Sequence, residues 1–318
     1  MFFHSILIVL GLLGLSTAAA QELPQEVLET AATLIPGTPP DEVKATPLPG
    51  LYQVTFGPQV VYLFADGRYL LHGDLIDLDT TVNLTEEVRQ TGRRSAIEDL
   101  DEAGMVVFSP TEPKSTITVF TDTECGYCVR LHNEVDQLLA GGVKVRYLGY
   151  PRAGTKSSSF DTLVSVWCSD NPQQAMTDAK SGRAIEPRIC DTDIGRHMDV
   201  AKLVGVRGTP TIVLQNGKTI PGYVPAEELI GMANAAAGSS HSLAVSAAGH
   251  VYSWGSGAFG KLGLGDDANV RIPRQIDFKR KRIARVACGP DHSAAVSESG
   301  EVLTWGAGSY GNLGHGDN

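Results

Sequence analysis

The sequence predicts three successive structural parts: a small α+β domain, an α/β domain and an all-β repeat segment. The α+β prediction rests on short alternating segments joined by the turn residues Asp66-Gly67, which favour an antiparallel hairpin. The α/β prediction rests on a β-branched segment, a Cys-Gly-Tyr-Cys segment, an apolar-periodic helix and a second β-like segment. The all-β prediction rests on an internal repeat, in which residues 241–266 recur as residues 292–317.

Length and composition limit the number of domains and the class of partner. The chain has 318 residues and is 42% hydrophobic. This is enough for two or three cores, since single domains usually hold about 100–200 residues. The formal net charge of −10 argues against a nucleic-acid partner.

The N-terminus has the features of a secretory signal. Residues 6–15 form an apolar run, and Ala18-Ala19-Ala20 supplies a small-residue cleavage pattern. We expect residues 1–20 to be a signal peptide that is cleaved after about Ala20, so that the mature chain is exported. Residues 1–4 contain no Lys or Arg, and a retained N-terminal anchor is the alternative.

Residues 21–82 predict the small α+β domain. A short helix over residues 24–33 precedes a Pro-rich turn region. Three alternating segments then follow, at residues 52–56, 60–64 and 69–72. This order favours a curved antiparallel sheet with one helix.

Residues 83–109 predict a helical linker. Thr85 is the expected N-cap, because Glu86 and Glu87 occupy the first turn after it. The helix is expected to extend to about Leu100 and is rich in charged residues. Such a helix can connect two domains.

Residues 110–237 predict the α/β domain. A strand at residues 116–121 leads into the cysteine segment, and a helix and a strand at residues 144–148 complete a strand–helix–strand unit. The further elements expected are helices at residues 160–167, 172–181, 193–204 and 226–236, and strands at residues 211–214 and up to 221. This order favours a sheet that closes with a hairpin.

The Cys125-Gly126-Tyr127-Cys128 segment is typical of disulfide exchange. A helix N-terminus stabilises a thiolate, so Cys125 is the expected nucleophile. Cys128 can resolve a mixed disulfide, while Gly126 and Tyr127 influence the relative stability of the two redox states. The alternatives are half of a zinc site and an inert structural disulfide. Zinc needs two further ligands, and neither a second CxxC nor a suitable His pair is present, so we expect no metal and no cofactor.

An exported chain lies in an oxidising compartment, so the remaining cysteines are expected to form disulfides where they can pair. Cys168 and Cys190 are expected to form a structural disulfide that closes a loop. Cys288 is then left over, and its role is not predicted.

Three further positions near the cysteine segment allow two interpretations each. Thr209-Pro210 opens a strand where a cis peptide bond could present backbone to the active site, although a trans bond is the commoner case. Asp122 is a proton-transfer partner or a strand-end cap, with the cap favoured. His132 is expected on the helix surface rather than as a catalytic base.

Several short motifs together resemble one protein family. The motifs are Val119-Phe120-Thr121-Asp122 before the cysteine segment, Tyr150-Pro151-Arg152-Ala153-Gly154, Trp167-Cys168, Cys190-Asp191, Gly208-Thr209-Pro210 and Pro221-Gly222-Tyr223. With them, the chain resembles the DsbC family of bacterial periplasmic protein disulfide isomerases over about residues 22–236. Glu124, directly before Cys125, departs from the pattern of the family. Its negative charge should oppose thiolate formation at Cys125.

The resemblance implies an architecture and a set of partners. It implies a homodimer formed by a cystatin-like dimerisation domain, a helical linker, and a thioredoxin-like domain whose active site faces a shared apolar cleft. It implies a cis Pro210 in a loop, Thr209-Pro210, that faces the substrate, and a disulfide between Cys168 and Cys190. It also implies a periplasmic location, misfolded disulfide-containing secreted proteins as substrates, and a membrane reductant of the DsbD type that keeps Cys125 reduced.

Residues 238–318 form the glycine-rich repeat. His241 and Trp254 recur as His292 and Trp305, each pair 51 residues apart. The segment resembles regulator-of-chromosome-condensation repeats, which build propeller blades. Fewer than two full blades are present, so we do not expect a working propeller, and a fusion, a truncation or an assembly artefact stays open.

The function predicted is an exported thiol:disulfide interchange enzyme that isomerises or reduces incorrect disulfides. The alternative is a binding protein, either a chaperone of the holdase type or a scaffold that uses the repeats. Replacing both Cys125 and Cys128 by Ala separates these, because binding then survives and exchange does not.

Overall fold

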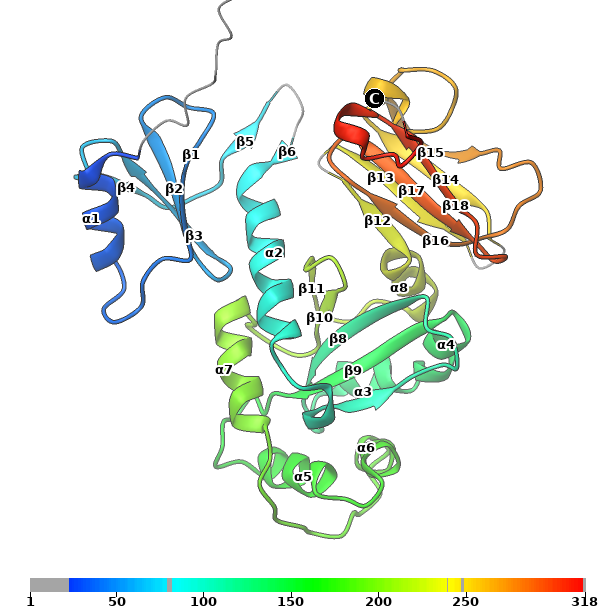
Figure 1. Ribbon diagram of the computed structural model, residues 1–318. Helices are drawn as coiled ribbons and strands as arrows, with labels where there is room; N and C mark the ends of the chain where they lie inside the picture. The colour runs from blue at the N-terminus through cyan, green and yellow to red at the C-terminus, as the bar shows by residue number, and fades with distance from the viewer. Residues whose placement is uncertain (1–22, 79–81, 239, 247–248, 317–318) are drawn as a thin grey trace, which may run out of the picture. The chain divides into compact units, whose positions relative to one another are not determined.

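The computed structural model describes residues 23–78, 82–238, 240–246 and 249–316 (Figure 1). The predicted signal peptide, residues 1–20, lies outside these ranges. Within them, no helix combines the length and the apolar character needed to cross a membrane. Contacts divide the chain into two compact units, the first of which contains residues up to Val54 together with Tyr62–Leu71.

The first unit is built on a four-stranded sheet with the order β1-β2-β3-β4. Its elements are α1 (Gln25–Thr33), β1 (Glu42–Ala45), β2 (Leu51–Phe56), β3 (Gln59–Phe64) and β4 (Leu70–Leu71). Val27 and Ala31 are the buried residues of α1. The predicted turn is present: Gly67 has φ +66°, and a Cβ there would lie 2.7 Å from the carbonyl oxygen of Glu26, so only glycine fits against the helix.

Helix α2 (Leu84–Glu98) confirms the predicted helix but corrects its N-cap. The side chain of Asn83 accepts a hydrogen bond from the amide of Glu86. Thr85, which we expected as the cap, is buried, and its hydroxyl accepts the Leu75 amide at 2.7 Å. The cap prediction was wrong because this contact joins α2 to the segment that carries β5 (Ile76–Asp77), which pairs with β6 (Val82–Asn83).

The α/β domain is a five-stranded sheet with the order β11-β10-β8-β9-β7. Its parallel pair flanks the cysteine segment. The strands are β7 (Val106–Phe108), β8 (Ser115–Thr121), β9 (Val143–Gly149), β10 (Thr211–Leu214) and β11 (Thr219–Pro221). The helices are α3 (Gly126–His132), α4 (Val135–Ala140), α5 (Ser158–Trp167), α6 (Pro172–Lys180), α7 (Ile194–Val204) and α8 (Ala226–Ala233). These confirm the predicted α/β class; β7 was not predicted.

Alternation along the central strand produces the two cores of this domain. Ile117 and Val119 of β8 belong to one cluster, which includes side chains of α3, α4, α6 and α8. Phe120 points to the other face and belongs to a second cluster with Ile97 of α2 and Ala201 of α7. The sheet is therefore covered by helices on both faces, and β8 is held firmly just before the cysteine segment.

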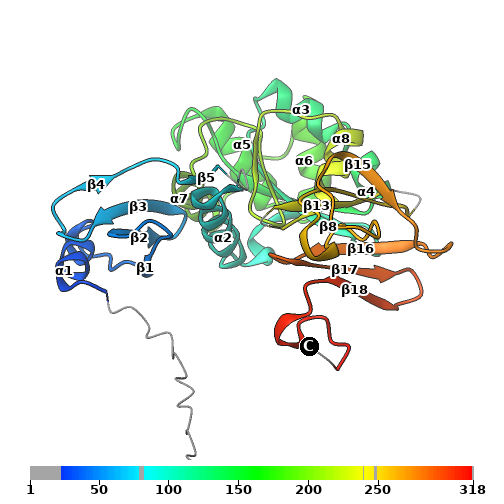
Figure 2. The same ribbon diagram turned by 90° about the horizontal axis from the view of Figure 1, so that it is seen from above.

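The repeat segment is all-β, as predicted, and its structure repeats with the sequence. Strands β13 (His241–Val245) and β14 (Val251–Gly255) recur as β17 (His292–Ser297) and β18 (Val302–Gly306), in the yellow to red part of both views (Figures 1 and 2). Gly255 and Gly306 have φ +107° and +108°, and a Cβ would meet a carbonyl oxygen at 2.5 and 2.6 Å. Equivalent glycines are thus required at equivalent turns.

The other strands of the repeat segment complete two sheets. The first has the order β12-β13-β14-β15 and the second the order β16-β17-β18. The added strands are β12 (Ala235–Ala237), β15 (Val270–Ile276) and β16 (Ile283–Cys288). The helix expected up to Ala236 ends at Ala233, because β12 pairs with β13.

Candidate functional site

The cysteine segment lies where a strand passes into a helix. Cys125 is the N-cap residue of α3, and Cys128 lies in its first turn. The Sγ atom of Cys125 is 3.1 Å from the carbonyl oxygen of Thr209, and the Thr209-Pro210 peptide bond is cis. A Cβ at Gly126 would have no heavy atom within 4 Å, so space beside Cys125 is open.

The surroundings of the two sulfurs shift their pKa values in opposite directions. Burial acts to raise the pKa of Cys125, but the neighbouring donors of Thr209 and Cys128, together with the Arg152 charge, outweigh it and lower that pKa. Burial raises the pKa of Cys128, although the nearby charge of Lys180 acts the other way. At a given pH a thiolate therefore forms more readily at Cys125.

Asp122 is buried directly before the cysteine segment and acts as an acceptor. Its carboxylate accepts hydrogen bonds from the amide of Glu124, from the amide and Nε of Arg152, and from the Ser159 hydroxyl. Burial acts to raise its pKa, but these bonds lower it overall. An anion held in this way fixes the loop and places Arg152 near Cys125.

His132 is not on the helix surface, and that prediction was wrong. The side chain is buried between α3, β9 and α6, where its nitrogens lie 3.0 Å from the Tyr147 hydroxyl and 3.0 Å from the Thr177 hydroxyl. Burial, assisted by the charge of Lys180, lowers its pKa to about 4. His132 is therefore a neutral link between three elements.

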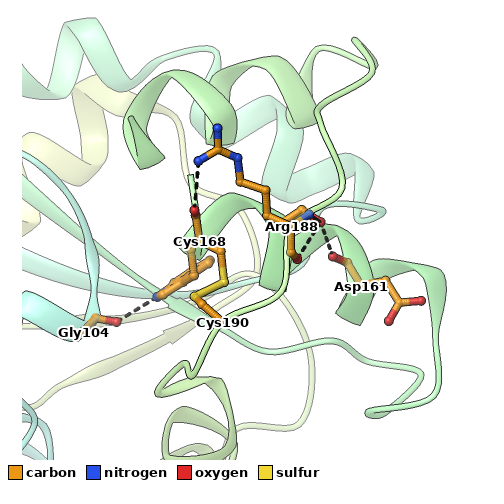
Figure 3. The surroundings of a disulfide bond; sticks show 7 residues. Gly104, Asp161, Cys168, Arg188 and Cys190 are labelled. Atoms are coloured by element: carbon orange, nitrogen blue, oxygen red, sulfur yellow. Dashed lines mark hydrogen bonds between the residues drawn. A yellow bond between two sulfur atoms is a disulfide. The ribbon is translucent and has the colours of Figure 1, made fainter. Parts of the chain in front are cut away.

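Cys168 and Cys190 are joined by a disulfide, at a Cα–Cα distance of 5.7 Å (Figure 3). Figure 3 shows the Arg188 side chain pointing at the carbonyl oxygen of Cys168, which it reaches at 3.4 Å. Beside the disulfide, Trp167 donates from Nε1 to the carbonyl oxygen of Gly104 at 2.8 Å. The disulfide therefore ties the segment between α6 and α7 to the end of α5.

Lys180 is a residue near the site that the sequence interpretation missed. It is the last residue of α6, is 3% exposed, and its Nζ donates to the Thr121 hydroxyl at 2.8 Å. The signal was its spacing, since Lys180 follows the buried Met176 by one helical turn and so lies on the buried face.

An aromatic pair, of which Tyr127 is exposed and Tyr223 partly buried, borders the cysteine segment. Tyr127 is 62% exposed, and its ring stacks on that of Tyr223 with a centroid distance of 6.4 Å. The guanidinium of Arg130 lies 4.4 Å from the Tyr223 ring centre. In the part of the chain that the structure describes, no group of three or more His, Cys, Asp or Glu side chains is placed to hold a metal ion.

Comparisons with known proteins identify two protein families in the first 237 residues. Residues 102–237 match the thioredoxin-like domain family, and residues 16–86 match the disulfide bond isomerase protein N-terminal domain family. The thiol:disulfide interchange protein DsbC of Dickeya dadantii is 40% identical over 196 residues, which cover 61% of this chain and 80% of that protein. The Escherichia coli K12 protein of the same name is 32% identical over 222 residues, covering 69% and 90%.

A solved disulfide interchange protein from Neisseria gonorrhoeae is 28% identical, covers 41% of this chain and 96% of its own, and superposes with a TM-score of 0.38. The thioredoxin-like domain and the relatives named DsbC define a protein disulfide isomerase or oxidoreductase. The chain belongs to the DsbC family of thiol:disulfide interchange proteins.

The repeat segment matches a different family. Residues 248–296, and residues 233–261 and 283–312, match the regulator of chromosome condensation (RCC1) repeat. The human E3 ubiquitin-protein ligase HERC2 is 52% identical over 82 residues, which cover 26% of this chain and 2% of that protein. The similarity identifies the repeat and does not extend to the activity of that ligase.

Proposed function

We propose that the chain isomerises or reduces incorrect disulfides in exported proteins through Cys125 and Cys128. The observation that carries this proposal is the opposite shift of the two thiol pKa values. Only a thiolate attacks a disulfide, so Cys125 reacts first. Cys128 reacts more slowly, which gives the bound substrate time to rearrange.

The reaction starts with the Cys125 thiolate and a wrong disulfide of the substrate. The Cys125 sulfur bonds to one substrate sulfur, and the other leaves as a thiolate. A free substrate thiolate then attacks the mixed disulfide, which forms a new substrate disulfide and returns Cys125 as a thiolate. Alternatively Cys128 loses its proton and attacks Cys125, which leaves an enzyme disulfide and a reduced substrate.

Two features beside the sulfurs support contact with a polypeptide substrate. The Thr209-Pro210 loop is adjacent to Cys125 and supplies a carbonyl oxygen at 3.1 Å. Tyr127 offers an exposed aromatic face next to the open space at Gly126. A bound segment can therefore gain apolar contact while its sulfur meets Cys125.

The family relationship supports further proposals on location and partners. The N-terminal domain match supports a homodimer, and the predicted signal at residues 1–20 supports export to the periplasm with cleavage after about Ala20. Because reduction leaves an enzyme disulfide, a membrane reductant of the DsbD type must return Cys125 to the thiol. The substrates are misfolded secreted proteins that contain disulfides.

The proposal is tested by refolding a scrambled-disulfide substrate with the mature full-length chain in a glutathione buffer. We expect recovery of native substrate that the Cys125→Ala variant loses. Cys288→Ala is the matched control, because burial raises the pKa of that thiol to about 12 and it should not contribute. Equal recovery with wild type and Cys125→Ala would contradict the proposal. Suppressed aggregation without recovery would favour the holdase alternative.

A further inference from the structure

Lys180 is a buried cation beside the exchange site that the reaction described above does not use. Its Nζ donates to the Thr121 hydroxyl at 2.8 Å and to the Asp122 carbonyl oxygen at 3.4 Å. These residues end β8 and begin the loop that leads to Cys125. Nζ also lies 5.8 Å from the centre of the Tyr147 ring. The charge is thus held against the end of β8 and the start of the loop that leads to Cys125.

All of these direct partners are uncharged. In the described ranges, no carboxylate lies within 4.0 Å of Lys180 Nζ. An ammonium buried without a counter-ion is costly. Burial lowers the pKa of Lys180 to about 8, while negative charge on Cys128, Cys125 and Asp122 acts to raise it. The ammonium form of Lys180 therefore persists at neutral pH. It is stabilised further when an anion forms nearby.

We propose that Lys180 is a positioning residue for disulfide exchange, whose ammonium stabilises the anionic sulfur of Cys128 and thereby favours resolution of the mixed disulfide. This inference rests on the proposed function. In the favoured step, Cys128 gives up its proton and its sulfur bonds to that of Cys125. The substrate sulfur leaves with the electron pair of the broken bond and takes up a proton. The enzyme dithiol is oxidised, and the substrate is reduced.

The titratable groups around Lys180 decide which charges near Cys128 can change when the pH is varied. They are Cys125, Cys128 and His132 of α3, Asp122 after β8, and Tyr147 of β9. His132 is neutral above about pH 4, Asp122 is an anion because its pKa is lowered, and burial raises the pKa of Tyr147 so that it stays neutral. Among these groups, the two thiols and Lys180 are therefore the ones whose charge can change at neutral and alkaline pH.

The first test compares the full-length wild type with Lys180→Met, which keeps the chain length of the side chain and removes its charge. The ¹³Cβ shifts of labelled, reduced cysteines report each thiol separately. We expect the pKa of Cys128 to rise by about one unit, that is, roughly tenfold less thiolate at a given pH below it. We also expect the mixed disulfide with a single-thiol substrate to persist several times longer. Lys202→Met is the control, since Lys202 is exposed on α7 and pairs with Asp199.

An unchanged Cys128 titration in a folded Lys180→Met variant would show that Lys180 is only structural, and would overturn the inference. A second measurement needs no substitution. Because coupling is reciprocal, the ¹³Cε shift of Lys180 should titrate at lower pH in the oxidised wild type, in which Cys125 and Cys128 form no thiolate, than in the reduced wild type. Identical titrations would overturn the inference even if Lys180→Met does not fold.

The same samples separate this inference from the proposed function. Exchange of the wild type with glutathione, lost in Cys125→Ala, tests the proposed function by itself. If the wild type exchanges but the Cys128 and Lys180 titrations are independent, only the role of Lys180 fails. If the wild type does not exchange, the proposed function fails, and the inference fails with it.

Discussion

At the scale of single residues, two cysteines of the same turn differ because of the atoms around their sulfurs. Cys125 is next to Thr209 and the charge of Arg152, which lower its pKa against the effect of burial. Cys128 is more deeply enclosed, and burial raises its pKa. When the environments of two identical groups shift their pKa values in opposite directions, the groups take different chemical roles.

Replacing Thr209 by Val, which has nearly the same shape, should leave less of Cys125 as the thiolate nucleophile at neutral pH. The buried hydroxyl of Thr209 makes no hydrogen bond within the described residues and is left to donate to the Cys125 thiolate, which lowers the pKa of Cys125. Its loss should therefore raise that pKa by roughly 0.4–1 unit. Absorbance of the thiolate against pH measures the change, and the rate of alkylation at pH 7 should fall accordingly. Thr211→Val is the control, since the Thr211 hydroxyl donates to the Gly208 carbonyl instead. A larger shift in the control would contradict the assignment.

At the scale of elements, the site depends on contacts between segments that are distant in sequence. His132 of α3 meets Tyr147 of β9 and Thr177 of α6, which are 15 and 45 residues away. The sequence pattern alone suggested a surface position, because a polar side chain was expected to face solvent. The same reason hid Lys180, whose partners Thr121 and Asp122 lie on another element.

The buried His132 makes stability depend on pH in a defined window. Its folded pKa of about 4 lies below the ordinary value of 6.5, so between these values the unfolded chain binds a proton that the folded chain does not. Stability should therefore fall as pH drops from about 6.5 to 4, by at most about 3 kcal/mol from this group. Urea unfolding at a series of pH values measures the loss. His132→Gln should make the loss smaller, and the remainder should reflect His197 and His241, whose pKa values are also lowered to about 4.

The disulfide should stabilise the segment that carries Lys180. Cys168 and Cys190 close a loop of 22 residues that includes α6. In the chain-entropy description, replacing both by Ala should lower the free energy of unfolding by about 3 kcal/mol. Denaturant unfolding measures this, with Cys288→Ala as the control. A loss no larger than in the control would mean that α6 is held by its packing alone.

At the scale of the whole molecule, local signals predicted the three parts and much of their order. The strand before Cys125, the Asp66-Gly67 turn and the repeat of Trp254 as Trp305 are each set by residues close in sequence, and the strands and helices that they predict are confirmed. The structure also places Cys125 at the start of a helix, where the sequence predicted it. The short strands β1 and β7 were missed because strand-forming signals over three or four residues are weak without their neighbours.

The α/β domain and the repeat segment have separate hydrophobic cores. The clusters on the two faces of the thioredoxin-like sheet use residues up to Ala233, whereas the cluster of the repeat segment begins at Leu243. Among the described residues, the groups with the largest effects on the pKa values of Cys125 and Cys128 all precede the repeat segment. The relatives named DsbC also match without it, since 222 residues of this chain cover 90% of the Escherichia coli protein.

A chain ending at Ala237 should therefore keep the exchange chemistry. We expect its rate of refolding a scrambled-disulfide substrate to be within about twofold of the full-length rate and to be lost in Cys125→Ala, because every contact to the two sulfurs is retained. The comparison needs equal circular dichroism spectra in the α-helical region, which show that the shortened chain is folded. A folded chain with a much lower rate, but with an unchanged pKa at Cys125, would mean that the repeats bind substrate. A changed pKa would instead mean that they shape the site.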